Sequence, residues 1–475
     1  MKKQITMLTL ASALLLSGCS GNTDDSTGAT TTAAETSVTT VQDTAETSET
    51  AEQEENTEPY FYFGEKETDE GWTYTMQKDS DRISVCITGY TGTDTEFVIP
   101  AEIEGYPVTS IDRYAFRGNE IITSVVFPDT MEIIDSNSFA DCTKLENVTI
   151  PESIKKISST SFEGTPWYEK QCAENDILII GSVLLRATNI SGEYIIPDNI
   201  TYISDWAFDE CEEITSVTIP ENVTEIGSGA FSQCCGLETV SIPSTITKIE
   251  YAVFADCCAL NNVVIPDSVT YIDLDVFSGC EALTSISIPE TVTYIGADAF
   301  ENTPWLTEKQ AENPLVVVNG MLIDGKTASG DVVISENITI IGEYSFLENE
   351  NITSVTVPDS VTEIGADAFY CCTNLKSVTM ADSVQIIGTS AFSDCAELEN
   401  INFSKKLTEL EYGVFYDCPK LTGFTVPDEL DIEIFRYTFG SYDEEYPIEA
   451  KYKGTTWVYV YDEYGFVNTV QSAER

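Results

Sequence analysis

A 23-residue motif repeats along most of this 475-residue chain. Its consensus, V-T-x-I-G-x-x-A-F-x-x-C-x-x-L-x-S-V-x-I-P, recurs between Pro128 and Pro427. Its phenylalanines are spaced by 23 or 46 residues throughout, and apolar Leu185 and Ile323 occupy the two positions that lack one. A fixed period of this length predicts a solenoid, in which each coil buries its apolar face against its neighbours. The phase phenylalanines are Phe116, Phe139, Phe162, Phe208, Phe231, Phe254, Phe277, Phe300, Phe346, Phe369, Phe392 and Phe415.

Each unit is expected to contain two short extended segments. The segment L-E-N-V-T-I-P (Leu145–Pro151) alternates apolar and polar residues, as a half-buried strand does. Stacked units would join these strands into a parallel sheet, and the proline that follows each strand would end the pairing. The V-T-x-I-G segment predicts a second extended stretch on the other side of the coil. Its glycine, for instance Gly227, is expected to permit the next bend.

The signature I-P-x-x-V-T-x-I-G-x-x-A-F-x-x-C-x-x-L resembles the BspA-like leucine-rich repeats of bacterial surface proteins, over roughly Gly89 to Pro427. This resemblance implies a mainly β solenoid. It would be a leucine-rich-repeat array of 23-residue coils with one parallel strand sheet and short extended or helical turns on the other side. The resemblance also implies a curved right-handed array on the cell exterior, associated with adhesion or host-protein binding. It supplies no catalytic residues.

The N-terminal residues predict export and lipid anchoring. Lys2 and Lys3 precede an apolar run too short to span a bilayer, and L-S-G-C follows, ending at Cys19. This box resembles the lipobox of bacterial lipoproteins, which implies that Cys19 carries lipid at the extracellular face of the membrane; the alternative is a plain signal peptide. We therefore expect a signal peptide over 1–18, a disordered Thr/Ser/Glu-rich stalk over 19–58, an N-terminal cap over 59–95, the solenoid over 96–430 and an aromatic-rich C-terminal cap over 431–475.

Charge and composition narrow the possible functions. The formal net charge is −57, which repels nucleic acid and anionic membranes and favours basic partners. The alternative is that the acidic surface only keeps an exported protein soluble. The chain contains no histidine, which excludes Ser-His-Asp and Cys-His catalysis and histidine-ligated zinc. We expect neither an enzyme nor a cofactor.

Most of the fourteen cysteines follow the repeat. Eight lie three residues after a phase phenylalanine, a position that predicts a buried column of small side chains. Coils about 4.8 Å apart would place neighbouring column members within disulfide range, so an oxidising exterior could link some of them. Three tandem pairs, at 234–235, 257–258 and 371–372, lack a C-x-x-C spacing and argue against zinc. The column comprises Cys142, Cys211, Cys234, Cys257, Cys280, Cys372, Cys395 and Cys418.

Two stretches interrupt the motif and keep its phase. T-P-W occurs at 165–167 and again at 303–305, six periods later, and each copy continues into A-E-N and an apolar run. We interpret them as a doublet variant of the coil. Trp167 and Trp305 are expected to cover the wider coil, with a role as contact points as the alternative.

Candidate ligand contacts come from two regions. The outward positions of the predicted sheet are small and polar, whereas protein interfaces favour Trp, Tyr and Arg, so any contact there would need many weak sites. Near the C-terminus, Trp457, Tyr459 and Tyr461 alternate, and they would either cover the last coil or bind a ligand. The acidic residues after the corner prolines form a row that calcium could neutralise, but no ligand loop of fixed spacing accompanies them, so we expect no metal site. The candidate contacts on the sheet are Ser216, Thr218, Thr239, Ser241, Ser285 and Ser287.

These features predict a surface-anchored binding or adhesion protein that presents the solenoid to an extracellular protein or polymer. Contact with the membrane is expected through the N-terminal lipid only, and no contact with nucleic acid is expected. The alternative is a structural scaffold of the envelope without a specific ligand, and an enzyme is the least expected class. Neither the ligand nor the oligomeric state follows from the sequence.

Overall fold

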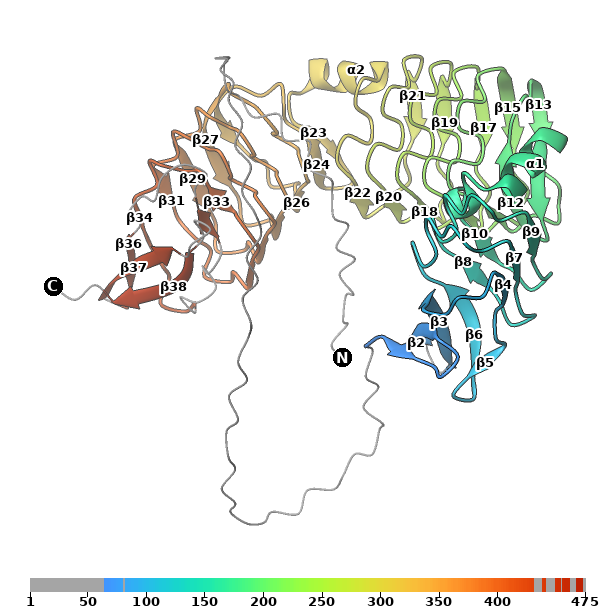
Figure 1. The fold of residues 1–475 in the computed structure, drawn as a ribbon. Helices are drawn as coiled ribbons and strands as arrows, with labels where there is room; N and C mark the ends of the chain where they lie inside the picture. Colours follow the sequence, from blue (N-terminus) through green and yellow to red (C-terminus); the bar gives the residue numbers. More distant parts are fainter. Residues whose placement is uncertain are drawn as a thin grey trace, which may run out of the picture. The chain divides into compact units, whose positions relative to one another are not determined.

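Most 23-residue units fold into one coil that contributes a short strand to each of two parallel ladders (Figure 1). The computed structural model describes residues 64–79, 82–430, 438–440, 449–453, 455–461 and 467–472. These residues belong to the larger of two units, Phe61–Arg475. The predicted signal peptide, Cys19 and the predicted stalk lie outside the described residues. Among the residues described, no helix is both long enough and apolar enough to cross a membrane.

The first ladder is the predicted parallel sheet, and the structure confirms it. Neighbouring coils pair in register at the repeat distance, as Val217 does with Val240. The apolar residue of each strand faces the interior because successive side chains alternate between the two faces. Its strands are β4 (Glu96–Val98), β7 (Ser124–Val126), β9 (Asn147–Thr149), β13 (Gly192–Ile195), β15 (Ile214–Thr218), β17 (Thr239–Ser241), β19 (Asn262–Val264), β21 (Ser285–Ser287), β25 (Gly330–Val333), β27 (Ile352–Val357), β29 (Ser377–Met380) and β31 (Asn400–Ile401).

The second ladder is formed by the V-T-x-I-G segments, which also pair in parallel. Most of its strands are two residues long, and their second residue, usually isoleucine, is buried, as at Ile272 and Ile364. The stack therefore has two hydrogen-bonded sides. The strands are β3 (Arg82–Tyr90), β6 (Tyr106–Ile111), β8 (Ile133–Ile134), β10 (Lys156–Ile157), β12 (Val183–Ala187), β14 (Tyr202–Ile203), β16 (Glu225–Ile226), β18 (Lys248–Ile249), β20 (Tyr271–Ile272), β22 (Tyr294–Ile295), β24 (Met321–Asp324), β26 (Ile340–Ile341), β28 (Glu363–Ile364), β30 (Ile386–Ile387) and β32 (Glu409–Leu410).

Antiparallel strands occur at both ends of the described array. At the N-terminal end, β2 (Trp72–Asp79) pairs with β3 and with β1 (Lys66–Glu67), and β5 (Glu102–Ile103) pairs with β6. Trp72 packs against Phe97 and Phe116 at ring-centroid distances of 5.4 and 6.4 Å, and so covers the first coil. The C-terminal strands are β33 (Phe415–Tyr416), β34 (Gly423–Thr425), β35 (Phe439–Gly440), β36 (Glu449–Tyr452), β37 (Thr455–Tyr461) and β38 (Val467–Ser472).

The phase phenylalanines form stacks inside the array. Consecutive rings lie between 4.7 Å (Phe346–Phe369) and 5.8 Å (Phe277–Phe300) apart, centroid to centroid, and are nearly parallel. Offset stacking at this distance is favourable for aromatic rings, and every stacked ring adds buried apolar area. The rings divide into three stacks, Phe116–Phe162, Phe208–Phe300 and Phe346–Phe415, which correspond to three clusters of buried residues.

A helix separates each stack from the next. Helices α1 (Pro166–Glu174) and α2 (Pro304–Glu312) occur in the doublet coils, after the short 3-10 helix η1 (Ser159–Phe162) in the first of them. In each helix a threonine caps the N-terminus, and the hydroxyl of Thr303 accepts a hydrogen bond from Leu306 N at 3.1 Å. Proline at the first helical position suits this start because its missing N–H has no partner there in any helix. The first ladder is interrupted at both helices, between β9 and β13 and between β21 and β25.

The two tryptophans of these helices cover the ends of the stacks, as predicted. The Trp167 ring lies 4.9 Å from that of Phe162, and the Trp305 ring lies 4.7 Å from that of Phe300. After each helix the chain returns through a hairpin, made by β11 (Ile177–Ile180) with β12 and by β23 (Val316–Val318) with β24. The helices themselves were not predicted for these segments.

The cysteine column is buried, as predicted, and hydrogen-bonded. In most coils the thiol donates to the carbonyl of the phase phenylalanine one coil earlier, as Cys257 Sγ does to Phe231 O at 3.1 Å. Burial raises the pKa of these thiols, to about 12 for Cys280 and Cys372. All the column cysteines are free thiols in the structure. The column therefore satisfies backbone carbonyls between coils.

The repeat glycines act through close packing, which corrects the expectation of a bend. A Cβ atom on Gly388 would lie 2.5 Å from Ala366 N in the preceding coil, and one on Gly296 would lie 2.5 Å from Leu274 N. Neither glycine has a positive φ. The bends instead occur at residues on either side of the phenylalanine, such as Asp298 and Asn302, whose φ values are 54° and 57°. Asn and Asp tolerate this left-handed conformation better than most residues do.

Candidate binding face on the second ladder

The outward position of the second ladder varies from coil to coil and is occupied by lysine, tyrosine, glutamate or isoleucine. It is the x of V-T-x-I-G, directly before the buried isoleucine. Together with the next outward residues of each coil, we call this surface the second-ladder face. Along the chain the position is occupied by Ile133, Lys156, Tyr202, Glu225, Lys248, Tyr271, Tyr294, Ile340, Glu363, Ile386 and Glu409.

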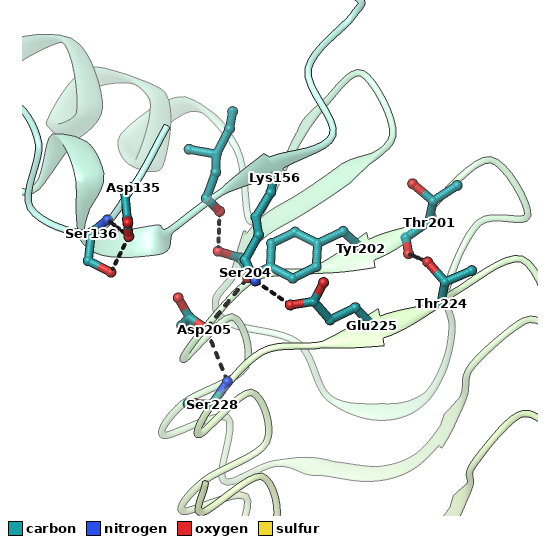
Figure 2. A network of polar contacts seen from close by, with 11 residues as sticks. Asp135, Ser136, Lys156, Thr201, Tyr202, Ser204, Asp205, Thr224, Glu225 and Ser228 are labelled. Carbon is teal, nitrogen blue, oxygen red and sulfur yellow. Dashed lines mark hydrogen bonds and ion pairs between the residues drawn. The ribbon is translucent and has the colours of Figure 1, made fainter. Parts of the chain in front are cut away.

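The first polar group on this face is centred on Lys156 (Figure 2). Its ammonium group forms an ion pair with Glu225 and lies 5.0 Å from the centroid of the Tyr202 ring. The Tyr202 hydroxyl lies 3.5 Å from Asp205 Oδ1, which also accepts a hydrogen bond from Ser228 N at 3.0 Å. An ammonium group is attracted both to the face of an aromatic ring and to a carboxylate. The arrangement is thus a cation site that the chain fills with its own lysine.

The second group repeats this chemistry further along the ladder. Lys248 Nζ lies 5.3 Å from the centroid of the Tyr271 ring, and the Tyr271 hydroxyl donates to Asp273 Oδ1 at 3.4 Å. Tyr271 stacks on Tyr294 with ring centroids 4.4 Å apart and an angle of 7° between the planes. The two partly exposed rings form an aromatic platform beside Lys248.

Carboxylates surround the tyrosine pair. Burial raises the pKa of Glu343, whose carboxylate hydrogen-bonds Tyr294 and lies near Asp273 and Glu363. Burial likewise raises the pKa of Glu363, and the neighbouring Glu411 and Glu409 carboxylates raise it further. The pKa of Tyr271 rises to about 12, chiefly through burial, so its hydroxyl remains protonated and able to donate. Crowded carboxylates are stabilised by an added cation, which makes this part of the face suited to a basic group.

The candidate residues on the first ladder lie side by side, as the repeat predicted. Thr239 Oγ1 donates to Ser216 Oγ at 3.3 Å across neighbouring coils. Thr218, Ser241, Ser285 and Ser287 are exposed. The description of this surface as uniformly small and polar was wrong, because the same outward column contains exposed apolar side chains. These are Val98, Val126, Ile195, Val264 and Val333.

The C-terminal aromatic candidates lie in β37, between β36 and β38. The backbone of Trp457 pairs with Ser472 and that of Tyr459 with Val470, while Tyr461 pairs with Val467. Their side chains lie outside the described part of the structure, as does Cys19. Their contact with a ligand remains a prediction.

The acidic corner row is exposed along the array. Within the described ranges, no group of three or more His, Cys, Asp or Glu side chains is placed to hold a metal ion. Neighbouring row members sit on different coils, and their exposed carboxylates are hydrated and screened by salt. The row consists of Asp129, Glu152, Asp198, Glu221, Asp267, Glu290 and Asp359.

The variable x of the repeat was the signal for the second-ladder face, and the sequence reasoning missed it. Positions that keep one residue type in every coil build the core, so a binding surface must come from the positions that vary. Within the solenoid, the sequence reasoning considered candidate contacts only among the outward residues of the first ladder, where hydroxyls predominate. It therefore passed over the tyrosines and lysines of the second.

Several solved structures are similar to this chain in sequence and coverage. The chain is similar to a leucine-rich repeat protein from Bacteroides ovatus (23% identity, covering 80% of this chain and 98% of that one, TM-score 0.30). It is also similar to a leucine rich cell surface protein from Faecalibacterium prausnitzii (30% identity, 76% and 83%, TM-score 0.26). A third similar structure is the pneumococcal vaccine antigen PcpA (16% identity, 82% and 88%, TM-score 0.33). Among curated proteins, none matches significantly.

A family model accounts for most of the array. The model for the BspA type leucine rich repeat region matches residues 109–234, 178–307 and 326–442. These ranges contain the phenylalanine stacks from Phe116 onward, the cysteine column, helix α1 and the first residues of helix α2. With its 23-residue coils and two parallel ladders, the chain belongs to the BspA-type leucine-rich repeat family.

Proposed function

We propose that this protein is an extracellular binding protein, anchored in the bacterial membrane by lipid on Cys19, that contacts a basic protein or polymer through the second-ladder face. Only the sequence supports this anchorage, through Cys19 and the predicted stalk. The F. prausnitzii relative is described as a cell surface protein, which agrees with this location. Adhesion follows if the partner belongs to another cell or to a host.

The observation that carries the proposal is the pair of lysine–tyrosine–carboxylate groups at Lys156 and Lys248. Lys156 lies between an aromatic ring and a carboxylate, and Lys248 lies over an aromatic ring, so ammonium groups are accommodated on this face. Beyond Lys248 the face continues with Tyr294, Glu343 and Glu363, where the neighbouring charges named above are all negative. A partner that presents lysine or arginine side chains would repeat the same contacts there.

Affinity per site should be modest. A cation on an exposed aromatic ring contributes about 0.5–1 kcal/mol, and exposed ion pairs contribute little more. Many weak contacts along successive coils, and many copies on one cell, would raise the apparent affinity. Binding should also weaken as the salt concentration rises.

The test uses two double variants with the same net charge. The purified full chain, Tyr271→Ala/Tyr294→Ala and Thr218→Ala/Ser241→Ala are each captured on a sensor and exposed to a lysine-rich peptide. We expect the tyrosine variant to bind several-fold more weakly, because the aromatic platform is lost, and the first-ladder variant to bind like the parent. Since charge is unchanged, a non-specific attraction to the acidic chain would affect all three equally.

Three results would contradict the proposal. Equal affinity of the three proteins would exclude the second-ladder face as the contact surface. A loss confined to the Thr218/Ser241 variant would assign the contact to the first ladder. If no extracellular protein or polymer binds the densely displayed chain, a scaffold role without a specific ligand would be favoured.

A further inference from the structure

The tandem cysteines divide into two environments. In each pair one member belongs to the buried column, and the other is partly exposed. Cys235 and Cys258 follow their column cysteine by one residue, so they occupy the same position in successive coils. Cys371 instead precedes its column cysteine. Only the first two of these three exposed thiols are therefore aligned by the repeat.

Cys235 and Cys258 lie next to each other across the coil boundary. Cys235 Sγ donates to Asp256 O at 3.4 Å, and Cys258 Sγ donates to the same oxygen at 3.3 Å. Because both sulfurs contact the same oxygen, the distance between the two sulfurs cannot exceed the sum of these two distances. The backbone keeps this register, because Gln233 N donates to Ala255 O at 2.8 Å between the same two coils. Both thiols are reached by solvent, unlike those of the column.

The two thiols are also chemically unequal. The pKa of Cys258 is raised to about 11, first through its polar contact with the Cys235 side chain and then through burial. A thiol whose pKa is raised is a thiolate less often and attacks less readily, so Cys258 is suited to the second, resolving step. The column thiols, with their pKa raised by burial, are inert by comparison.

We propose that Cys235 and Cys258 form a surface dithiol that reacts with a small external disulfide to cross-link two adjacent coils. The Cys235 thiolate attacks one sulfur of the small disulfide, breaks its S–S bond and releases one half as a thiolate. The Cys258 sulfur, after losing its proton, then attacks the mixed disulfide at Cys235 and releases the second half. Two protein thiols are oxidised to one disulfide, and the small disulfide is reduced to two thiols that take up both protons.

The site selects among oxidants by charge. Glu281 lies near Cys258, and the whole chain is strongly acidic. A cationic disulfide such as cystamine is attracted to this surface, whereas oxidised glutathione, which is anionic, is repelled. The product would hold together two coils in the middle of the second phenylalanine stack, and so limit local opening there.

The experiment treats the folded, reduced full chain with cystamine and then with an alkylating reagent, followed by peptide mass spectrometry. In the parent protein we expect Cys235 and Cys258 to be joined to each other, with no cysteamine retained. In Cys235→Ser and in Cys258→Ser the remaining thiol cannot be resolved, so it should retain a stable cysteamine adduct. Cys371→Ser should form the cross-link like the parent. Oxidised glutathione should react several-fold more slowly than cystamine at low salt, and the difference should shrink at high salt.

Other outcomes would overturn the proposal. Cysteamine retained on both Cys235 and Cys258 in the parent would mean that the two sulfurs do not meet. Alkylation of both cysteines after cystamine treatment would mean that the pair does not react. A disulfide between column cysteines would place the reactive pair elsewhere. Circular dichroism of each serine variant checks that the solenoid is intact. A trivalent arsenical, which binds two neighbouring thiols, tests whether Cys235 and Cys258 are close together in the parent protein.

Discussion

Replacing Phe254 with alanine should test the phenylalanine stack at the middle of its longest run, Phe208–Phe300. The ring is fully buried, and it lies 5.6 Å from the rings of both Phe231 and Phe277 at an angle of 9° to each. A buried Phe→Ala change costs about 3–5 kcal/mol. Two aromatic contacts are lost together, each contributing about 0.5–1.5 kcal/mol. The backbone ladders hold the coils apart and prevent the cavity from closing, so the expected cost is near the upper end, about 5 kcal/mol.

Urea unfolding followed by circular dichroism measures the loss, and hydrogen exchange locates it. Exchange should accelerate in the strands β15 to β22 around the second stack and remain slow in β27 to β31, because each stack has its own buried cluster. Phe254→Leu retains apolar volume and loses the stacking, so it should cost about 1–2 kcal/mol. The control is Val264→Ala, at a side chain that is 62% exposed, and it should change stability by less than about 0.5 kcal/mol.

A small effect would refute this reasoning. If Phe254→Ala cost less than about 1 kcal/mol, comparable to the control, the ring could not be a core element of the coil. If the loss spread evenly over all three stacks, the array would unfold as one cooperative body, and the separation of the buried clusters by α1 and α2 would have no energetic meaning.

Three further predictions concern the repeat, the anchor and the charge. Deleting one whole unit, Pro243 to Ile265, should leave a folded protein, because Phe231 would then stack on Phe277 in register. Deleting eleven residues from the same region should break the packing between neighbouring coils. Equal melting temperatures of the two variants would contradict the solenoid. Cys19→Ala should move the protein from the detergent phase to the aqueous phase, and unchanged partition would exclude lipid at this position. Burial and neighbouring carboxylates raise the pKa of Asp275 and Asp367 to about 6. Because these folded-state pKa values exceed those of the unfolded chain, the folded state binds more protons between about pH 4 and pH 6. The free energy of unfolding should therefore rise as the pH falls from 7 towards 5. Asp275→Asn and Asp367→Asn should each flatten that profile, and a melting temperature that is highest at neutral pH in all three proteins would show that these carboxyls have ordinary pKa values.

The second-ladder face depends on contacts that the repeat period does not reveal. Lys156 and Glu225 are 69 residues apart, a separation that includes the irregular coil with α1. Tyr294 and Glu343 are likewise on opposite sides of α2 in the chain. Because an irregular coil changes the local path of the chain, counting in units of 23 does not say which outward side chains meet across it. The folded chain decides these pairs.

The period by itself determined the buried part of this protein. A coil of 23 residues that packs against a like neighbour places its phase phenylalanine over the one 23 residues earlier, and its column cysteine beside the carbonyl of that phenylalanine, as at Cys257 and Phe231. One repeated apolar pattern is sufficient to determine this core, because each buried residue packs against the equivalent residue of the next coil. The tertiary structure alone decided what happens where copies differ. It turned two coils into helices, made the glycines sites of close packing, and brought Lys156 against Glu225 and Tyr294 against Glu343 across the irregular coils. Those contacts depend on side-chain direction and coil spacing, which the pattern of residue types does not encode.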